Sequence, residues 1–276
     1  MRPMIAVPAA IALATSAAFA EASHHQVGSG VVPIPGLGID PAAQQPTAWH
    51  FRLFPSVLSA SDKFDDGGSR TSLLDLSSLR NYSLNLFAER RFGERWSVSA
   101  LTAWQVLVMD GAGVTRVNSL ADSWANVRYS MPTALGPLSA IASVKVPGTY
   151  PESEATSTKQ IDVEAKAAMT FIGILPRVSA VLAAGYRLRL GMVKDEVSGA
   201  LLLPVDVVTG VTLTPTIAGG YAIGLGDLAK DAISAGASAT WNIARELQFI
   251  GSWSRTIWGR NVVVADLFSL GIGTSF

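Results

Sequence analysis

The chain has 276 residues, with 21 basic and 21 acidic side chains, three histidines and no cysteine. Balanced charge argues against a nucleic-acid-binding protein, an apolar content of 49% excludes a largely disordered chain, and the absence of cysteine excludes a disulfide scaffold, a thiolate zinc site and an iron–sulfur cluster. The mean hydropathy of +0.34 indicates a membrane protein, whereas 25 glycines and 14 prolines do not fit a bundle of helices.

Residues 1–20 predict a cleaved secretory signal peptide. One positive charge, Arg2, precedes a short apolar run that ends in Ala18-Phe19-Ala20, an A-x-A cleavage pattern. A membrane anchor is the alternative, but the apolar run is short and contains Pro8. Cleavage after Ala22 is a second option. A secreted chain without cysteine favours the envelope of a bacterium.

Residues 21–46 contain several glycines and prolines and predict a flexible segment or a plug for the domain that follows. Cleavage after Ala22 would give a mature chain that begins Ser23-His24-His25. A free amine with histidine as the third residue can bind Cu(II) or Ni(II) through nitrogen ligands, and cleavage after Ala20 would abolish this site. No other metal site and no cofactor is predicted.

Apolar and polar residues alternate with a period of two from about residue 47 onward, which is typical of strands with one apolar face. The pattern is clearest in residues 160–171, where Ile161 and Val163 fall on one face and Asp162 and Glu164 on the other. The same alternation recurs in residues 82–88, 125–129, 138–146, 178–190, 233–243 and 268–276.

The strands are expected to close into a barrel in a membrane. The best candidate for a membrane helix, residues 207–226, carries Pro215 and five glycines and is rejected. The polar rows consist largely of Ser, Thr, Asn and Gly, and the apolar rows of Ala, which cannot fill the core of a sandwich but can face lipid. Because every backbone group in a bilayer must be paired, a spanning sheet must close.

Loop lengths set the strand number. Short connections are predicted at 91–94, 131–137, 173–176 and 244–246, and longer ones at 61–72, 109–119, 147–158, 191–199, 224–231 and 259–261. Outer-membrane barrels have short periplasmic turns and long outer loops. Eleven runs are obvious, and an even number requires that residues 199–222 form two strands broken near Thr209-Gly210. The prediction is an all-β, antiparallel transmembrane β-barrel of 12 strands over residues 47–276, with 10 strands as the alternative. Arg255, on an apolar row, is expected at the membrane interface.

The last strand resembles the C-terminal signal of bacterial outer-membrane barrels, which the barrel-assembly machinery recognises. The matching residues are Phe268, Leu270 and the terminal Phe276. A strand of a soluble sandwich that happens to end in phenylalanine is the alternative.

The chain also resembles the outer-membrane proteins of the meta-pathway phenol degradation family, thought of as 12-stranded transporters for small, often hydrophobic, molecules. The matching segments are residues 82–86, 92–98, 121–129 and 136–148, and the resemblance covers residues 47–276. The chain departs from the family pattern at Ala121-Asp122, where the family has a Gly-Asp pair.

Charged residues on the polar rows are the candidates for lining the lumen and selecting the solute. They are Asp162, Glu164 and Lys166 on one strand, Arg187 and Arg189 on the next, and Arg128, Arg52 and His50 elsewhere. Opposite charges on neighbouring strands either stabilise a polar interior or form a charged constriction. His50 has no partner visible in the sequence that would make it a catalytic dyad.

The predicted function is therefore passive passage of a small molecule across the bacterial outer membrane, without enzymatic activity. The expected partners are outer-membrane lipid, the assembly machinery and a small-molecule solute. A barrel enzyme acting on lipid and a structural or adhesive barrel with partner-binding outer loops are the alternatives. Balanced charge favours a weakly charged or hydrophobic solute over an ion.

Overall fold

The computed structural model describes residues 18–19, 32–33, 49–73, 76–111, 114–149, 160–191, 194–223, 231–244 and 246–276. Every regular element among these residues is a strand. The strands are β1 (Ala18–Phe19), β2 (Val32–Pro33), β3 (Trp49–Phe64), β4 (Arg70–Ser72), β5 (Leu76–Phe92), β6 (Trp96–Gly111), β7 (Val114–Leu120), β8 (Ser123–Thr133), β9 (Gly136–Val146), β10 (Ile161–Leu175), β11 (Val178–Leu190), β12 (Glu196–Leu202), β13 (Val205–Val208), β14 (Val211–Ala222), β15 (Asp231–Ala244), β16 (Leu247–Arg260) and β17 (Val262–Ser275). Across the described residues, we find no helix with the length and apolarity that a membrane span requires.

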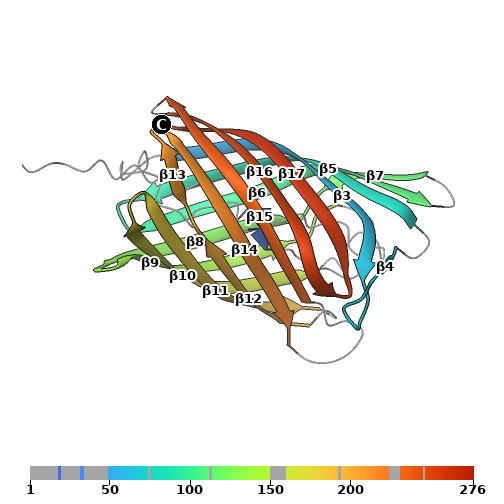
Figure 1. The fold of residues 1–276 in the computed structure, drawn as a ribbon. Coiled ribbons are helices and arrows are strands. Elements are labelled where there is room, and N and C mark those ends of the chain that lie inside the picture. Colours follow the sequence, from blue (N-terminus) through green and yellow to red (C-terminus); the bar gives the residue numbers. More distant parts are fainter. Residues whose placement is uncertain are drawn as a thin grey trace, which may run out of the picture.

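The strands from β3 onward form a closed antiparallel barrel of 12 strands, as the sequence predicts (Figure 1). The ring closes where β3 meets β17, and the backbone N–H of Trp49 donates to the carbonyl of Phe276 over 2.8 Å. Both described ends of the barrel chain therefore lie at the end with the short turns. Figure 1 shows β7 and the adjoining part of β6 reaching beyond the other strands at the opposite end.

Three short strands, β4, β7 and β13, do not add to the 12 strands of the ring. Each occupies the same place in the ring as a longer strand next to it in the chain. β4 pairs with β3 and leads into β5, β7 and β8 both pair with β6, and β13 follows β12 between β11 and β14. Pro204 lies between β12 and β13 and has no N–H to donate, which accounts for the interruption.

Side chains alternate between an exposed apolar exterior and a buried polar interior. In β10, Ile161 is 45% exposed whereas Asp162 is fully buried, and Val163 and Glu164 repeat the contrast. The same alternation runs along β5, β6 and β11. The predicted apolar rows therefore face outward and the polar rows face the lumen, as a barrel in lipid requires.

Exposed aromatic side chains gather toward the two ends of the exterior. Those near the short turns are Phe92, Trp96, Trp241, Phe249 and Phe276, and those nearer the long loops are Tyr82, Trp104, Tyr186, Tyr221, Trp253, Trp258 and Phe268. Aromatic girdles at both interfaces flank the apolar band of outer-membrane barrels. Arg255 lies beside the second set, 3.7 Å from Asp266, which also accepts a hydrogen bond from Trp253. The interface position expected for Arg255 stays a prediction.

The strand break predicted near Thr209-Gly210 is confirmed, because β13 ends at Val208 and β14 begins at Val211. Gly210 has a φ of 80°, a left-handed conformation that glycine adopts without the steric penalty of a side chain. Several predicted loops are too long. β3 ends at Phe64 and β4 spans Arg70–Ser72 within the predicted loop 61–72, and β8 ends at Thr133 and β9 begins at Gly136 within 131–137. β6 continues to Gly111 and β7 begins at Val114 within the predicted loop 109–119, and β12 begins at Glu196 within 191–199. These polar strand ends extend toward water, where no apolar row is needed.

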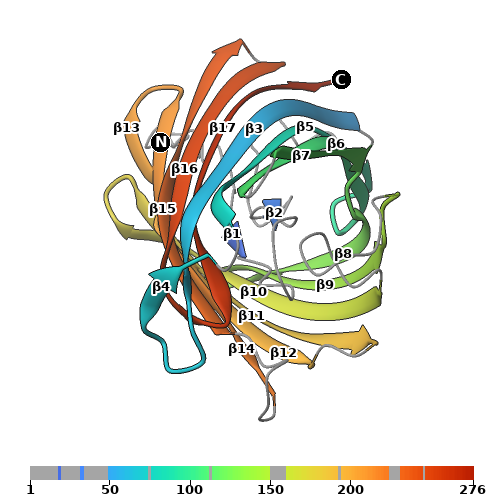
Figure 2. The same cartoon turned by 90° about the vertical axis from the view of Figure 1, so that its right-hand side faces the viewer.

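β1 and β2 pair with each other and appear inside the ring of strands in Figure 2. β1 belongs to the segment predicted to be the signal peptide and β2 to the predicted segment 21–46. The rest of both segments lies outside the described residues.

Candidate functional site: the charged wall of the lumen

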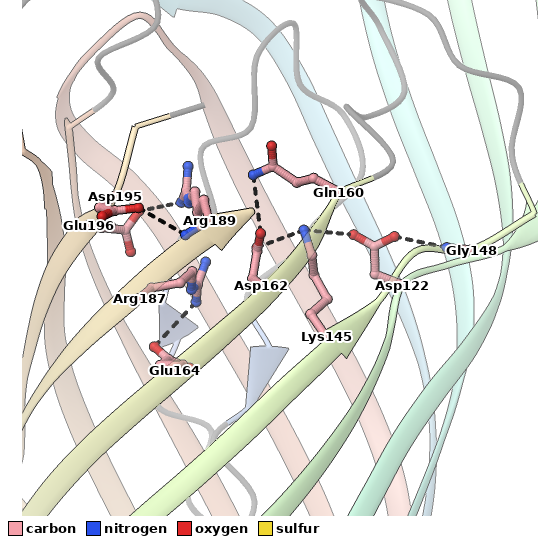
Figure 3. Close-up of polar contacts among 10 residues, drawn as sticks. All are labelled: Asp122, Lys145, Gly148, Gln160, Asp162, Glu164, Arg187, Arg189, Asp195 and Glu196. Carbon is pink, nitrogen blue, oxygen red and sulfur yellow. Dashed lines mark hydrogen bonds and ion pairs between the residues drawn. The ribbon is translucent and has the colours of Figure 1, made fainter. Parts of the chain in front are cut away.

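Charged side chains gather on the lumen wall formed by β8–β12 (Figure 3). Trp124, Lys145, Asp162 and Arg189 are register partners on four successive strands, so their side chains enter the lumen from one continuous row. Lys145 Nζ lies 2.8 Å from Asp162 Oδ2 and 3.4 Å from Asp122 Oδ2. The lysine thereby joins the turn before β8 to β10.

A second group of ion pairs continues along β10–β12. The Glu164 carboxylate forms two ion pairs: its Oε2 lies 2.6 Å from Lys166 Nζ, and its Oε1 lies 3.5 Å from a guanidinium nitrogen of Arg187. The Arg187 guanidinium also lies 5.1 Å from the centre of the Trp124 ring, a cation–π contact between β11 and β8. Arg189 and Glu196 pair over 2.6 Å. Arg187 therefore reaches from one side of the charged wall to the other.

We call these eight side chains the charge belt. They are Asp122, Lys145, Asp162, Glu164, Lys166, Arg187, Arg189 and Glu196. Four are cations and four are carboxylates, so the belt has no net charge when all are ionised. All are at least nine-tenths buried at the side chain, and burying unpaired charge would be costly. The ion pairs offset the free-energy cost of burying these charges. Because the charge belt is neutral, it has little preference for ions of either sign.

The loop above the charge belt is anchored through Asp195. Its carboxylate accepts hydrogen bonds from the backbone N–H of Arg189 at 2.9 Å and from the Tyr186 hydroxyl at 2.6 Å. The hydrogen bond from Arg189, and to a smaller extent that from Tyr186, lowers the pKa of Asp195 below its ordinary value. The ionised carboxylate thus ties the residue before β12 to β11, next to the Arg189–Glu196 pair.

The predicted site residues divide between two places. Asp162, Glu164, Lys166, Arg187 and Arg189 come together in the charge belt. Arg128, Arg52 and His50 lie nearer the short turns on β3 and β8. There Arg128 pairs with Glu89 of β5 over 2.7 Å, and Arg52 lies 5.8 Å from the Phe87 ring centre.

Sequence reasoning missed three members of the charge belt, Lys145, Asp122 and Glu196. Lys145 was visible on a polar row of its own strand. Glu196 was hidden because residues 191–199 were assigned to a loop, although β12 begins at this residue. Asp122 lies between β7 and β8, and only the fold reveals its proximity to Lys145.

The lumen also contains apolar patches that the alternation did not single out. One consists of Phe87, Leu101 and Trp124, with Phe54 packed against it. A second consists of Ile141, Ala168, Val181, Ala183, Ala200, Leu202 and Ala218. Two further buried apolar clusters consist of Leu58, Ala60, Leu73, Leu79, Leu107 and Ala265, and of Phe64, Ala232, Val262 and Val264. Hydroxyl side chains such as Thr214, Ser238 and Thr240 are buried on β14 and β15. A solute in this lumen would therefore meet compensated charge, hydroxyl groups and apolar surface.

No group of three or more metal-ligating side chains occurs within the described part of the chain. The predicted Ser23-His24-His25 site lies outside it.

Comparisons with known proteins identify the fold. Neither the scan against protein-family models nor the search of curated proteins found a match. Among solved structures, the chain is similar to the COG4313 outer membrane channel from Pseudomonas putida F1, with a TM-score of 0.67, 14% identity and coverage of 86% of this chain and 100% of that one. The translocator domain of the autotransporter NalP from Neisseria meningitidis is similar with a TM-score of 0.58 and 12% identity, and the match covers 82% of this chain and 88% of that one. The KdgM porin in complex with disordered oligogalacturonate is similar with a TM-score of 0.52 and 9% identity, and the match covers 83% of this chain and 99% of that one.

These likenesses establish the fold of an outer-membrane β-barrel, found both in channels and in an autotransporter domain. At 14% identity or below they identify no solute. Membership of the meta-pathway phenol degradation family stays a prediction.

Proposed function

We propose that the chain is an outer-membrane channel that lets a small solute pass passively through the barrel lumen. The observation that carries this proposal is the closed ring of 12 strands with an apolar exterior and a lumen lined by the charge belt. The similarity to the COG4313 channel supports it.

The lining favours a weakly charged or hydrophobic solute. The charge belt is internally compensated, so it attracts neither cations nor anions strongly. Apolar surface at Phe87, Leu101 and Trp124 adjoins it and offers contact to an uncharged molecule.

The test is solute flux into liposomes that contain the purified, folded protein. We expect swelling in small neutral solutes and similar rates for cations and anions of one size. No flux above that of empty liposomes would contradict the proposal and favour a structural or adhesive barrel.

A second candidate function rests on one row of side chains at the short-turn end. Ser275 of β17 and Glu89 of β5 are the register partners of His50 on either side, and all three are buried. This sequence of hydroxyl, imidazole and carboxylate has the residue types of a hydrolytic triad. Glu89, however, is already paired with Arg128.

We therefore expect Ser275→Ala and His50→Ala to leave lipid and ester hydrolysis at the level of the unaltered protein, measured with fluorogenic esters in detergent and in vesicles. An ester hydrolysis rate that both substitutions abolish would establish the enzyme instead.

The C-terminal aromatic is proposed to act in barrel assembly. Phe276 is 68% exposed, and its ring stacks on Phe51 with centres 5.6 Å apart. We expect Phe276→Ala to lower the amount of folded protein in the outer membrane of cells, because the assembly machinery loses its signal. Refolding of the purified variant into vesicles should stay efficient, and Phe51→Ala controls for the lost ring contact. Equal loss in cells and in vesicles would show a folding defect and contradict the signal.

A further inference from the structure

The outer part of the β5–β7 exterior carries two arginines on one row. Arg80 of β5 pairs with Val108 of β6, and Val108 pairs with Arg116 of β7. Both arginines are exposed, and in the described part of the chain neither forms a hydrogen bond or an ion pair. Asp110, two residues beyond Val108, accepts a hydrogen bond from Ser78. These arginines are thus free to bind an anion.

The strand alternation places both arginines on the lipid side. The neighbours of Arg80, Leu79 and Asn81, are buried in the lumen. Asn81 donates to Gln105, and Gln105 donates to Ser119, so the lumen side of the same three strands is occupied by a separate polar chain.

The surface below the arginines changes from polar to apolar in two further rows. The next outward row toward the short turns is Tyr82, Val106 and Asn118. The row below that is Leu84, Trp104 and Leu120, which are 49%, 52% and 41% exposed. The first row thus offers cations, the second a hydroxyl and an amide, and the third hydrocarbon. A lipid presents its phosphate, its polar linkage and its acyl chains in the same order.

We propose that this surface is a binding site for a phosphorylated lipid of the outer leaflet, with Arg80 and Arg116 holding the phosphate. Two strand spacings of about 4.8 Å separate the two arginines, a gap that two guanidinium groups can close on one phosphate. Arginine presents planar paired donors that match phosphate oxygens. The site requires that the barrel span the outer membrane, but it is independent of which solute passes through the lumen.

The test measures binding of bis-phosphorylated lipid A to the folded barrel in phosphatidylcholine nanodiscs, with dephosphorylated lipid A as the second probe. The variant is Arg80→Gln/Arg116→Gln. The matched control is Arg90→Gln/Arg95→Gln, which removes two exposed arginines from the short-turn end. We expect about fivefold weaker binding for each lost arginine and about thirtyfold for the pair. The control variant and the dephosphorylated lipid should show no such change.

Several outcomes would overturn the assignment. They are unchanged binding in the Arg80→Gln/Arg116→Gln variant, an equal loss for the dephosphorylated lipid, and displacement of the lipid by inorganic phosphate, which would indicate a site for a free anion. A shift of the native mass from an oligomer to a single chain would assign the surface to a second copy. Solute flux is expected to be unchanged in the variant because neither arginine faces the lumen, so failure of lipid binding and failure of transport are distinguished.

Discussion

Replacing Glu164 by glutamine is expected to make the channel prefer anions. The substitution removes one carboxylate from a charge belt of four cations and four carboxylates. A unit charge about 5 Å from a passing ion changes its free energy by about 0.8 kcal/mol in a water-filled lumen, which is about fourfold in local concentration. The local concentration of anions rises and that of cations falls by this factor, so the anion-to-cation permeability ratio should change about sixteenfold. The reversal potential in a salt gradient across a planar bilayer measures it.

The partner of Glu164 supplies the matched control. Arg187→Gln removes one cation from the same ion pair and should shift the reversal potential toward cation preference. The double variant restores a neutral charge belt and should return the potential close to that of the unaltered protein. A double variant that keeps the preference of either single variant would contradict control of selectivity by net belt charge. Gel electrophoresis in detergent verifies that each barrel is folded, because the heated sample then migrates more slowly than the unheated one.

Placing an arginine on the lipid face should destabilise the barrel far more than placing a large apolar side chain there. Ala142 of β9 is exposed between the register partners Val127 and Ala165, away from both aromatic girdles. Ala142→Arg is expected to lower the free energy of unfolding from lipid vesicles by about 2–4 kcal/mol, because charge near the bilayer midplane is poorly solvated. Denaturant titration followed by tryptophan fluorescence measures the change.

Ala142→Leu is the control of similar bulk and should be tolerated, since lipid adapts to an added hydrocarbon group. A large loss of stability for leucine and a small one for arginine would place this face against protein or water instead of lipid.

The barrel was predictable because the alternation of apolar and polar residues is a local property of each strand. Ile161 and Asp162 already show which face meets lipid, and loop parity required the break at Gly210. Strand ends were harder, since strands that extend into water need no apolar row. Residues 109–119 were assigned to a loop for this reason, although β7 begins at Val114.

The candidate site was predictable only in part. The charges of β10 and β11 stood out on polar rows, and the fold brings them together. The contacts of Arg187 with Trp124 and of Lys145 with Asp122 depend on which strands adjoin and in which register, and no single segment encodes that. Glu89 and Ser275 beside His50 required the same knowledge.

The most direct test of passage through the lumen uses a single introduced cysteine, since the chain has none of its own. Ser143 of β9 is buried on the lumen side between Ile141 and Lys145, whereas the adjacent Ala142 faces outward. Conductance of each cysteine variant is recorded in a planar bilayer before and after a cationic methanethiosulfonate reagent. We expect the reagent to reduce the current through Ser143→Cys and to leave Ala142→Cys and the unaltered protein unchanged. A current through Ser143→Cys that the reagent does not alter, although mass spectrometry shows the thiol to be modified, would contradict a solute path along this wall of the lumen.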